Sequence, residues 1–138
     1  MIHTLVLSRA LRKTIEKAAR AAHPRECCGL LEGTLLDHSA RVSAVHAARN
    51  LAQAADRFEI DPAEHIRLLR SARENGRAIV GCYHSHPDGK AQPSDCDREN
   101  GSDEEFVWLI AAAKDNHVEL AAFAFAGDAF TPVTIAQD

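Results

Sequence analysis

The chain of 138 residues has no long apolar run. The apolar stretch near its N-terminus is too short for the core of a signal peptide. No segment approaches the roughly 20 consecutive apolar residues that a membrane-spanning helix requires. We therefore expect a cytoplasmic protein with no membrane partner.

A concentration of basic residues is also missing. The formal net charge is −4, and the 16 Lys and Arg residues are spread along the sequence, so we do not expect nucleic acid as a partner. Hydrophobic residues make up 46% and charged residues 26%, which is an ordinary globular balance. This length and composition predict a single domain over residues 1–138.

Several chemical motifs are absent as well. The four cysteines form no C-x-x-C pair, which argues against a zinc ribbon or a thioredoxin-like site. In a reducing compartment they are expected to be small, partly buried thiols. There is no H-E-x-x-H zincin signature and no G-x-S-x-G nucleophile elbow.

Two helices are indicated by capping residues and apolar spacing. The first should begin at Ser8, an N-cap residue followed by apolar residues at helical spacing, and should end before Pro24. The second should begin at Asp61-Pro62, where proline suits the first helical position, and should end at Asn75-Gly76. The apolar positions of this second helix are expected at Ile66, Leu69 and Ala72 or Arg73.

Strands are expected at 2–7, 27–36, 41–48, 78–83, 106–113, 118–125 and 131–135, with a short extended piece at 58–60. The strand at 131–135 should lie at an edge of the sheet. This order predicts the α/β class, with a mixed, mostly antiparallel sheet covered by two main helices.

The residues that follow the strand at 78–83 suggest a metal site. His84 and His86 project to one face of an extended chain, about 7 Å apart, so that both imidazoles can converge on one ion. Pro93 precedes what resembles a helix start, where Ser94 and Asp97 would share a face. Two histidines and one carboxylate are a common ligand set for catalytic zinc, which keeps its fourth position open for water.

This spacing alone leaves other interpretations open. The same residues also fit a polar loop followed by a capped helix start, with no ion bound. A cysteine-containing site would use Cys82, His84, His86 and Cys96. A Ser-His-Asp triad based on Ser94 is less favoured, because the nucleophile elbow is missing.

A zinc hydrolase also needs a general base for its water molecule. Glu26 lies upstream, where the first predicted helix gives way to a strand. Considered alone, this residue is most simply a solvated carboxylate.

Two segments together resemble the JAMM/MPN+ metallopeptidases. They are P-R-E-C-C-G-L-L-E-G at 24–33 and H-S-H-P-D-G-K-A-Q-P-S-D-C-D at 84–97. The pattern of that family is a glutamate ahead of C-G-x-L-x-G, then H-x-H, seven residues, Ser, two residues and Asp. The chain matches this spacing without a gap, and the resemblance extends from about Thr4 to Phe125. It implies an MPN-like fold of the short bacterial type.

The resemblance also implies a role for each site residue. His84, His86 and Asp97 would bind zinc. Glu26 would deprotonate the attacking water and pass the proton to the leaving amine. Ser94 would donate a hydrogen bond to the tetrahedral oxyanion. The implied substrate is a peptide or isopeptide bond near the C-terminal Gly-Gly tail of a ubiquitin-like or sulfur-carrier protein.

The chain departs from the family in the polar stretch 97–105, which Gly101 should break early, where short bacterial relatives continue with a more apolar helix. It also lacks the long insertions of eukaryotic deubiquitinases, so linkage-specific deubiquitination is not expected. A non-catalytic MPN-type protein-binding scaffold and a zinc hydrolase of a small amide or cell-wall peptide remain alternatives. A disulfide between Cys28 and Cys96 and the oligomeric state are left open.

Overall fold

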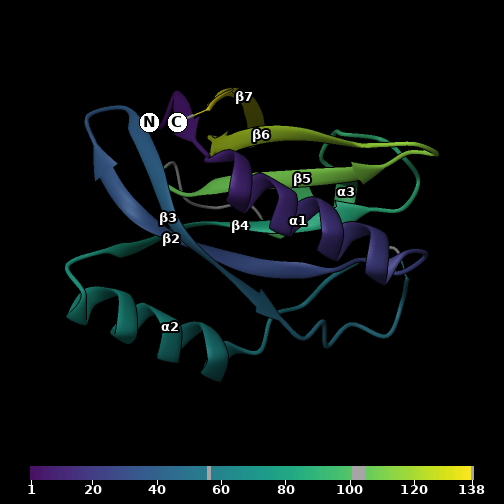
Figure 1. Cartoon of the computed structure of the whole chain (residues 1–138), viewed down its shortest axis with the longest axis horizontal. Coiled ribbons are helices and arrows are strands. Elements are labelled where there is room, and N and C mark those ends of the chain that lie inside the picture. Colours follow the sequence, from purple (N-terminus) through teal and green to yellow (C-terminus); the bar gives the residue numbers. More distant parts are fainter. Residues whose placement is uncertain (56, 101–104, 138) are drawn as a thin grey trace.

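The computed structural model describes residues 1–55, 57–100 and 105–137, and its described strands close into a barrel (Figure 1). The strands are β1 Thr4–Val6, β2 Cys28–Leu36, β3 Ser39–Ala48, β4 Ala78–His86, β5 Val107–Ala113, β6 Val118–Ala126 and β7 Ala129–Ala136. The helices are α1 Arg9–Ala22, α2 Pro62–Glu74 and α3 Asp95–Asn100. The α/β class is therefore confirmed, with a third, short helix beside the two that were predicted.

The order of strands around the barrel is β1-β3-β2-β4-β5-β6-β7. Four neighbouring pairs are antiparallel, and the pairs β1–β3, β1–β7 and β4–β5 are parallel. The prediction of an edge strand near residues 131–135 is wrong, because β7 pairs with β6 on one side and with β1 on the other. The few residues of β1 join β3 to β7 and so close the sheet.

Helix α1 begins as predicted. The Ser8 side chain accepts a hydrogen bond from the Leu11 backbone N–H, which satisfies one of the unpaired donors of the first turn. The helix ends at Ala22, shortly before Pro24. Ile15 and Ala19 are buried, and Figure 1 shows α1 lying across the strands of the barrel.

Helix α2 has the predicted ends but a different buried face. Asp61 accepts from the Ala63 N–H at 2.9 Å, and Gly76 takes the left-handed backbone conformation just after the C-terminal end. Leu68 and Ala72 are the buried residues, whereas Ile66 and Leu69 are 50% and 39% exposed. The prediction is therefore correct at Ala72 and wrong at Ile66 and Leu69. The helix contacts β2 and β4 through one side, and of the neighbours Leu68 and Leu69 only one can point to that side.

Strand β4 separates two apolar clusters. Val80 and Tyr83 belong to the cluster that contains the buried side chains of α1. Cys82 belongs to a second cluster with Leu68 and Trp108. Because side chains alternate along a strand, His84 and His86 continue the face of Cys82.

Strand β4 continues to His86, so that both histidines lie within regular structure. Pro87 follows directly, as expected for a residue that ends a strand. The predicted break at Gly101 falls outside the described residues.

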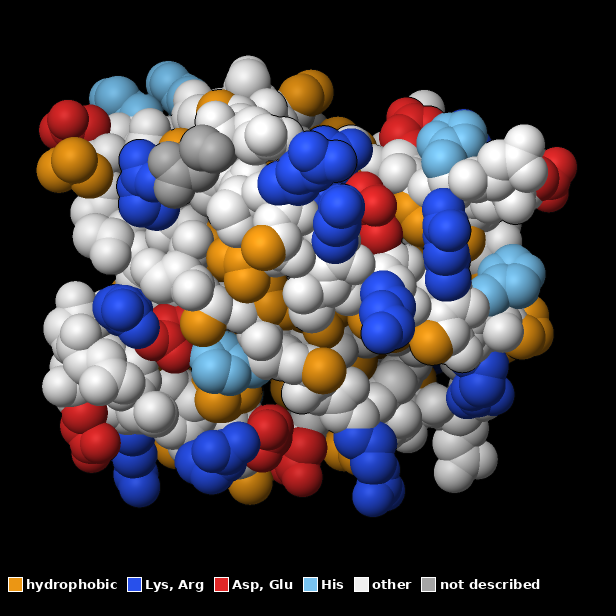
Figure 2. All heavy atoms as spheres, in the orientation of Figure 1, with side chains coloured by type: hydrophobic (Ala, Val, Ile, Leu, Met, Phe, Trp, Pro, Cys, Tyr) orange, Lys and Arg blue, Asp and Glu red, His pale blue; other side chains and the backbone are white. Residues whose placement is uncertain are grey.

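The surface carries charges of both signs. On the face shown in Figure 2, Lys and Arg side chains are interspersed with acidic ones, as their distribution in the sequence suggested. Among the described residues, no helix combines the length and the apolar character needed to span a membrane.

Candidate metal centre

Three buried side chains converge beside the end of β4. The Nε2 atoms of His84 and His86 are 3.0 Å apart. A carboxylate oxygen of Asp97, on α3, lies 3.2 Å from Nε2 of His84 and 3.1 Å from Nε2 of His86. All three residues are at most 5% exposed. The sequence-predicted histidine pair and aspartate are thus brought together.

This triangle fits the dimensions of a zinc site. A tetrahedral zinc ion with ligands at about 2.0–2.1 Å requires ligand atoms about 3.3 Å apart. The three observed separations of 3.0–3.2 Å are close to that value. Two imidazoles and one carboxylate also form a donor set that leaves a tetrahedral position open.

Helix α3 fixes the Asp97 carboxylate. The Ser94 N–H donates to Asp97 Oδ2 at 2.8 Å, and the Asp97 N–H donates to Ser94 Oγ at 3.1 Å. This reciprocal exchange is a capping-box arrangement. The capped helix start, considered as an alternative to a metal site, is therefore present, and it holds the carboxylate against the two histidines.

The turn after β4 orients His86. Its Nδ1 lies 2.9 Å from the Lys90 carbonyl oxygen, so the tautomer that donates from Nδ1 leaves the Nε2 lone pair facing the centre. The Lys90 N–H in turn donates to Asp88 Oδ1 at 2.9 Å. Asp88 thus supports the turn and contributes no ligand atom to the triangle.

His84 is oriented mainly by ring packing. Phe58 stacks on its imidazole with ring centroids 4.3 Å apart, and Trp108 meets it edge-on at 5.9 Å. Within the described part of the chain, the buried Nδ1 of His84 has no hydrogen-bond partner. The two aromatic rings therefore hold this imidazole without the polar support that His86 receives.

The electrostatics of His84 and Asp97 favour metal binding. Burial lowers the pKa of His84, so its imidazole is neutral near pH 7. Burial alone would also lower the pKa of His86, but its hydrogen bonds to Asp97 and to the Lys90 carbonyl oxygen outweigh burial and raise the pKa instead. Burial alone would raise the pKa of Asp97, but hydrogen bonds from both histidines hold it far below the ordinary range. Asp97 is thus ionised, and a neutral imidazole and a carboxylate are both competent ligands.

Glu26 lies on the open side of the centre. It follows α1 in the irregular segment before β2 and is only 6% exposed. One of its carboxylate oxygens and the ligand nitrogens of His84 and His86 lie within 4.8 Å of one another. Because an Asp97 oxygen lies 3.1–3.2 Å from the ligand nitrogens of both imidazoles, the geometry favours Asp97 as the third ligand and leaves Glu26 beside the open position.

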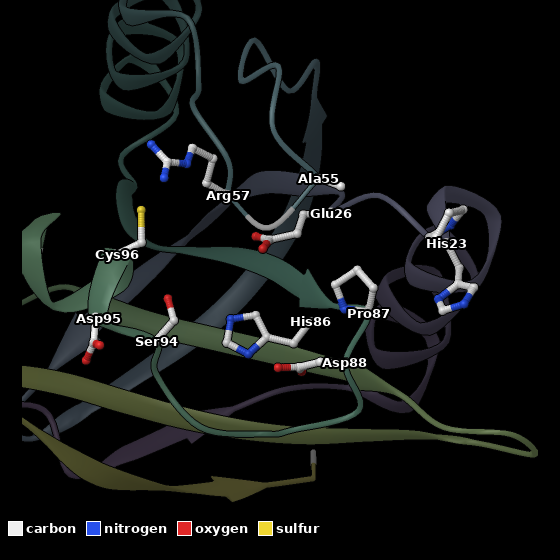
Figure 3. Close-up of a pocket in the computed structure, with 11 residues that line it drawn as sticks. His23, Glu26, Ala55, Arg57, His86, Pro87, Asp88, Ser94, Asp95 and Cys96 are labelled. Carbon is white, nitrogen blue, oxygen red and sulfur yellow. The ribbon is translucent and has the colours of Figure 1, made fainter.

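A cleft of about 710 Å³ opens over this centre. In Figure 3 the Glu26 carboxylate and the Ser94 hydroxyl point into the same space, which the His86 ring also borders. Arg57 and Cys96 line this cleft and also a neighbouring apolar cavity of about 550 Å³. The cleft therefore places Glu26, His86 and Ser94 where a bound substrate could reach them.

The cysteine-based alternatives are not supported. Cys82 lies in an apolar cluster, and burial raises the pKa of its thiol, which disfavours the thiolate that a metal requires. All four cysteines are free thiols, so Cys28 and Cys96 do not form the disulfide that was left open.

Other contributors to the site were not identified from the sequence. Phe58 and Trp108 hold the His84 ring, and both were noticed only as parts of predicted strands. The alternation of H-S-H places Ser85 on the opposite face of the strand from the two histidines. No local pattern marks Arg57, which lines the cleft, because the loop that contains it has no regular period.

The chain is similar in sequence and structure to several known proteins. A family model described as prokaryotic homologs of the JAB domain matches residues 8–125. A desampylase of Haloferax volcanii is 36% identical over 117 residues, which cover 83% of this chain and 80% of that protein. A CysO-cysteine peptidase of Mycobacterium tuberculosis is 25% identical over 116 residues, which cover 84% of this chain and 78% of that protein. A solution structure of a protein from Desulfitobacterium hafniense has a TM-score of 0.87 at 29% identity, covering 97% of this chain and 92% of that one.

Proposed function

The chain belongs to the family of prokaryotic homologs of the JAB domain, and from this premise we propose that it is a zinc-dependent metallopeptidase. Its substrate would be a peptide bond near the C-terminal Gly-Gly tail of a ubiquitin-like or sulfur-carrier protein. Family membership confirms the resemblance seen in residues 24–33 and 84–97. Relatives named desampylase and CysO-cysteine peptidase support hydrolysis of this kind. We further propose that residues 1–138 act as one catalytic domain in the cytoplasm.

The triangle of ligand atoms carries the proposal. His84 and His86 would hold zinc through Nε2, and Asp97 through its carboxylate, at separations that suit this ion. When bound, zinc supplies a Lewis acid for the scissile carbonyl and lowers the pKa of a water molecule. The other steps belong to residues of the chain.

Glu26 is the proposed general base. Its carboxylate would take a proton from the water as the water oxygen adds to the carbonyl carbon. It would then deliver that proton to the amine nitrogen as the C–N bond breaks. A position within 4.8 Å of both histidine ligand atoms suits this transfer.

Ser94 is the proposed oxyanion donor. Its oxygen accepts from the Asp97 N–H, which leaves the hydroxyl proton for donation into the cleft. A donor aimed at the oxygen of the tetrahedral intermediate stabilises the charge that develops there. Ser94 would therefore act electrostatically and not as a nucleophile.

The Gly-Gly tail is a suitable substrate for physical reasons. Glu26 and the two histidines are nearly fully buried, so a scissile carbonyl must approach them closely. Glycine has no side chain to obstruct this approach and accepts a wide range of backbone conformations.

The proposal can be tested with a sulfur-carrier protein whose Gly-Gly tail is extended by a short peptide. Zinc-loaded protein, chelated protein and zinc-loaded Glu26→Gln would each be incubated with it. Hydrolysis by the first sample alone is expected. Equal hydrolysis by all three samples, or none by any, would contradict the proposal.

Two companion substrates separate the alternatives. A lysine-linked conjugate of the same carrier tests isopeptide cleavage, and a small peptide amide tests the zinc hydrolase of small substrates. Tight binding of the carrier without cleavage of any substrate would indicate the non-catalytic scaffold.

A further inference from the structure

The position of Glu26 is not set by regular secondary structure. The residue lies between the end of α1 at Ala22 and the start of β2 at Cys28. A general base must lie within hydrogen-bond reach of its water molecule. The contacts that hold residues 25–27 therefore determine whether Glu26 can act.

Ser85, on β4, holds this segment through two hydrogen bonds to Cys27. Its N–H donates to the Cys27 carbonyl oxygen at 3.0 Å, and its Oγ accepts from the Cys27 N–H at 2.8 Å. Ser85 is 1% exposed and stands between His84 and His86 on β4. The residue that separates the two histidines is thus bonded to the neighbour of Glu26.

Asn50 holds the segment through its side-chain amide. Its Nδ2 donates to the carbonyl oxygens of Glu26, at 3.0 Å, and Arg57, at 3.1 Å. Its Oδ1 accepts from the N–H groups of Ala52 and Glu59, both at 2.9 Å. One side chain therefore uses two donors and two acceptor positions to tie Glu26 to the loop that contains Arg57.

Arg25 strengthens the same connection. Its guanidinium donates to the carbonyl oxygens of Ala52 and Gln53 at 3.2 and 3.0 Å. The described residues between Asn50 and Glu59 thus bond to residues 25 and 26: Asn50 donates to the Glu26 carbonyl oxygen, and Arg25 donates to the carbonyl oxygens of Ala52 and Gln53. This loop also contributes Ala55 and Arg57 to the wall of the cleft.

We propose that Ser85 and Asn50 are positioning residues, which together fix Glu26 over the metal centre and join it to the cleft wall. The inference rests on the function of Glu26 proposed above. Neither side chain needs to touch the substrate. Their effect should therefore appear in the chemical step and not in zinc binding.

The variants Asn50→Ala and Asn50→Asp test one side of this arrangement. Asp keeps the two acceptor positions but cannot donate to the carbonyl oxygens of Glu26 and Arg57. On the tail-extended carrier, both variants should lower kcat by about 10- to 100-fold, since a small misplacement of a catalytic group has effects of this size. KM should change by less than about threefold, and zinc affinity should stay at the wild-type value.

Ser85 is tested by a matched pair. Ser85→Ala removes the acceptor for the Cys27 N–H and should lower kcat by about 10-fold or more. Ser85→Thr keeps a hydroxyl and should restore most of the activity. Asn75→Asp serves as a control, because it removes a side-chain donor to a backbone carbonyl, that of Ser71, at the end of α2. It should leave kcat unchanged.

Crystal structures of the Asn50 variants give a measurement independent of activity. The Glu26 carboxylate should be displaced from its wild-type position relative to the two histidines. An unchanged Glu26 position, or a wild-type kcat in Asn50→Ala and Ser85→Ala, would overturn the inference. An inactive wild-type enzyme together with a displaced Glu26 would contradict the proposed function and still support the positioning role.

Discussion

Ser94 and Asp97 each contribute to two parts of the site. They cap α3 by exchanging backbone-to-side-chain hydrogen bonds, and they also line the cleft and the metal centre. The S-x-x-D spacing is therefore required both for the helix start and for the position of the carboxylate. The effect of substituting either residue must therefore be compared with the effect of removing a helix cap elsewhere in the chain.

Ser94→Ala provides such a comparison. Loss of the oxyanion donor should lower kcat by roughly 10²–10³-fold, and loss of the cap should lower the free energy of unfolding by about 1 kcal/mol. Ser8→Ala, which removes the cap of α1, should reduce stability by a similar amount without lowering kcat. Steady-state kinetics and chemical denaturation measure the two effects. Similar kcat values for the two variants would show that Ser94 acts only as a cap.

His84→Ala tests the ligand assignment. Because a catalytic zinc site has only three protein ligands, the variant should bind zinc at least about 100-fold more weakly than the wild type. His117→Ala, at an exposed position, should bind zinc normally. Calorimetric titration with zinc gives both affinities. One zinc ion per His84→Ala chain at unchanged affinity would exclude His84 as a ligand.

Strand β2 contains a further buried carboxylate besides Glu26 and Asp97, that of Glu32. Glu32 is 4% exposed and pairs with His46 at 2.9 Å and Arg77 at 3.3 Å. Burial alone would raise its pKa, but the hydrogen bonds from His46 and Arg77 outweigh burial and lower the pKa. Glu32 thus connects β2 to β3 and to the residue just before β4.

This pairing predicts a pH dependence of stability. A carboxylate with a lowered pKa in the folded state stabilises fully above the ordinary glutamate pKa of about 4.3. That contribution is lost as the pH falls through the lower, folded-state value. Glu32→Gln should therefore be less stable than the wild type at pH 7, and the difference should shrink below about pH 4.

Thermal denaturation between pH 3 and pH 7 measures this difference. Glu119→Gln removes a carboxylate from the exposed pair with Lys114 and controls for the change in net charge. It should have the smaller effect at pH 7, because exposed ion pairs contribute little. A difference between wild type and Glu32→Gln that is constant over this pH range would contradict the assignment.

Local sequence patterns predicted the elements whose ends are marked by capping residues or by turns. Ser8 and the Asp61-Pro62 pair marked the starts of α1 and α2, and the hairpins β2–β3 and β5–β6 followed from their turns. Closure of the barrel was not predicted, because it depends on three residues of β1 pairing with two distant strands. The buried face of α2 was predicted at Ala72 but not at Leu68, since Ile66 and Leu68 are both apolar and only packing decides between them.

The site shows the same division between local and distant information. The H-x-H motif places both imidazoles on one face of a strand, and the S-x-x-D motif gives the cap of α3, because strand alternation and a helix cap are local properties. The catalytic and ligand roles of these residues remain predictions. Glu26 needed the family resemblance, and its support by Asn50 needed the structure. Contacts between residues 26, 50 and 85 depend on how the segments meet, which no local pattern encodes.

At the scale of the whole molecule, the barrel brings three distant segments to one cleft. Glu26 comes from the junction of α1 and β2, the histidines from β4, and Ser94 and Asp97 from α3 and the turn before it. Two apolar clusters on opposite faces of β4 support this arrangement. The catalytic proposal therefore concerns the fold as a unit, and its central claim is hydrolysis at a defined place on a protein tail.

The most direct test of that claim is the intact mass of a sulfur-carrier protein extended past Gly-Gly, measured after incubation with the zinc-loaded enzyme. We expect a product that ends at the second glycine, and we expect no such product with Glu26→Gln. An unchanged substrate mass with fully zinc-loaded wild-type protein, or the same product with Glu26→Gln, would contradict the claim.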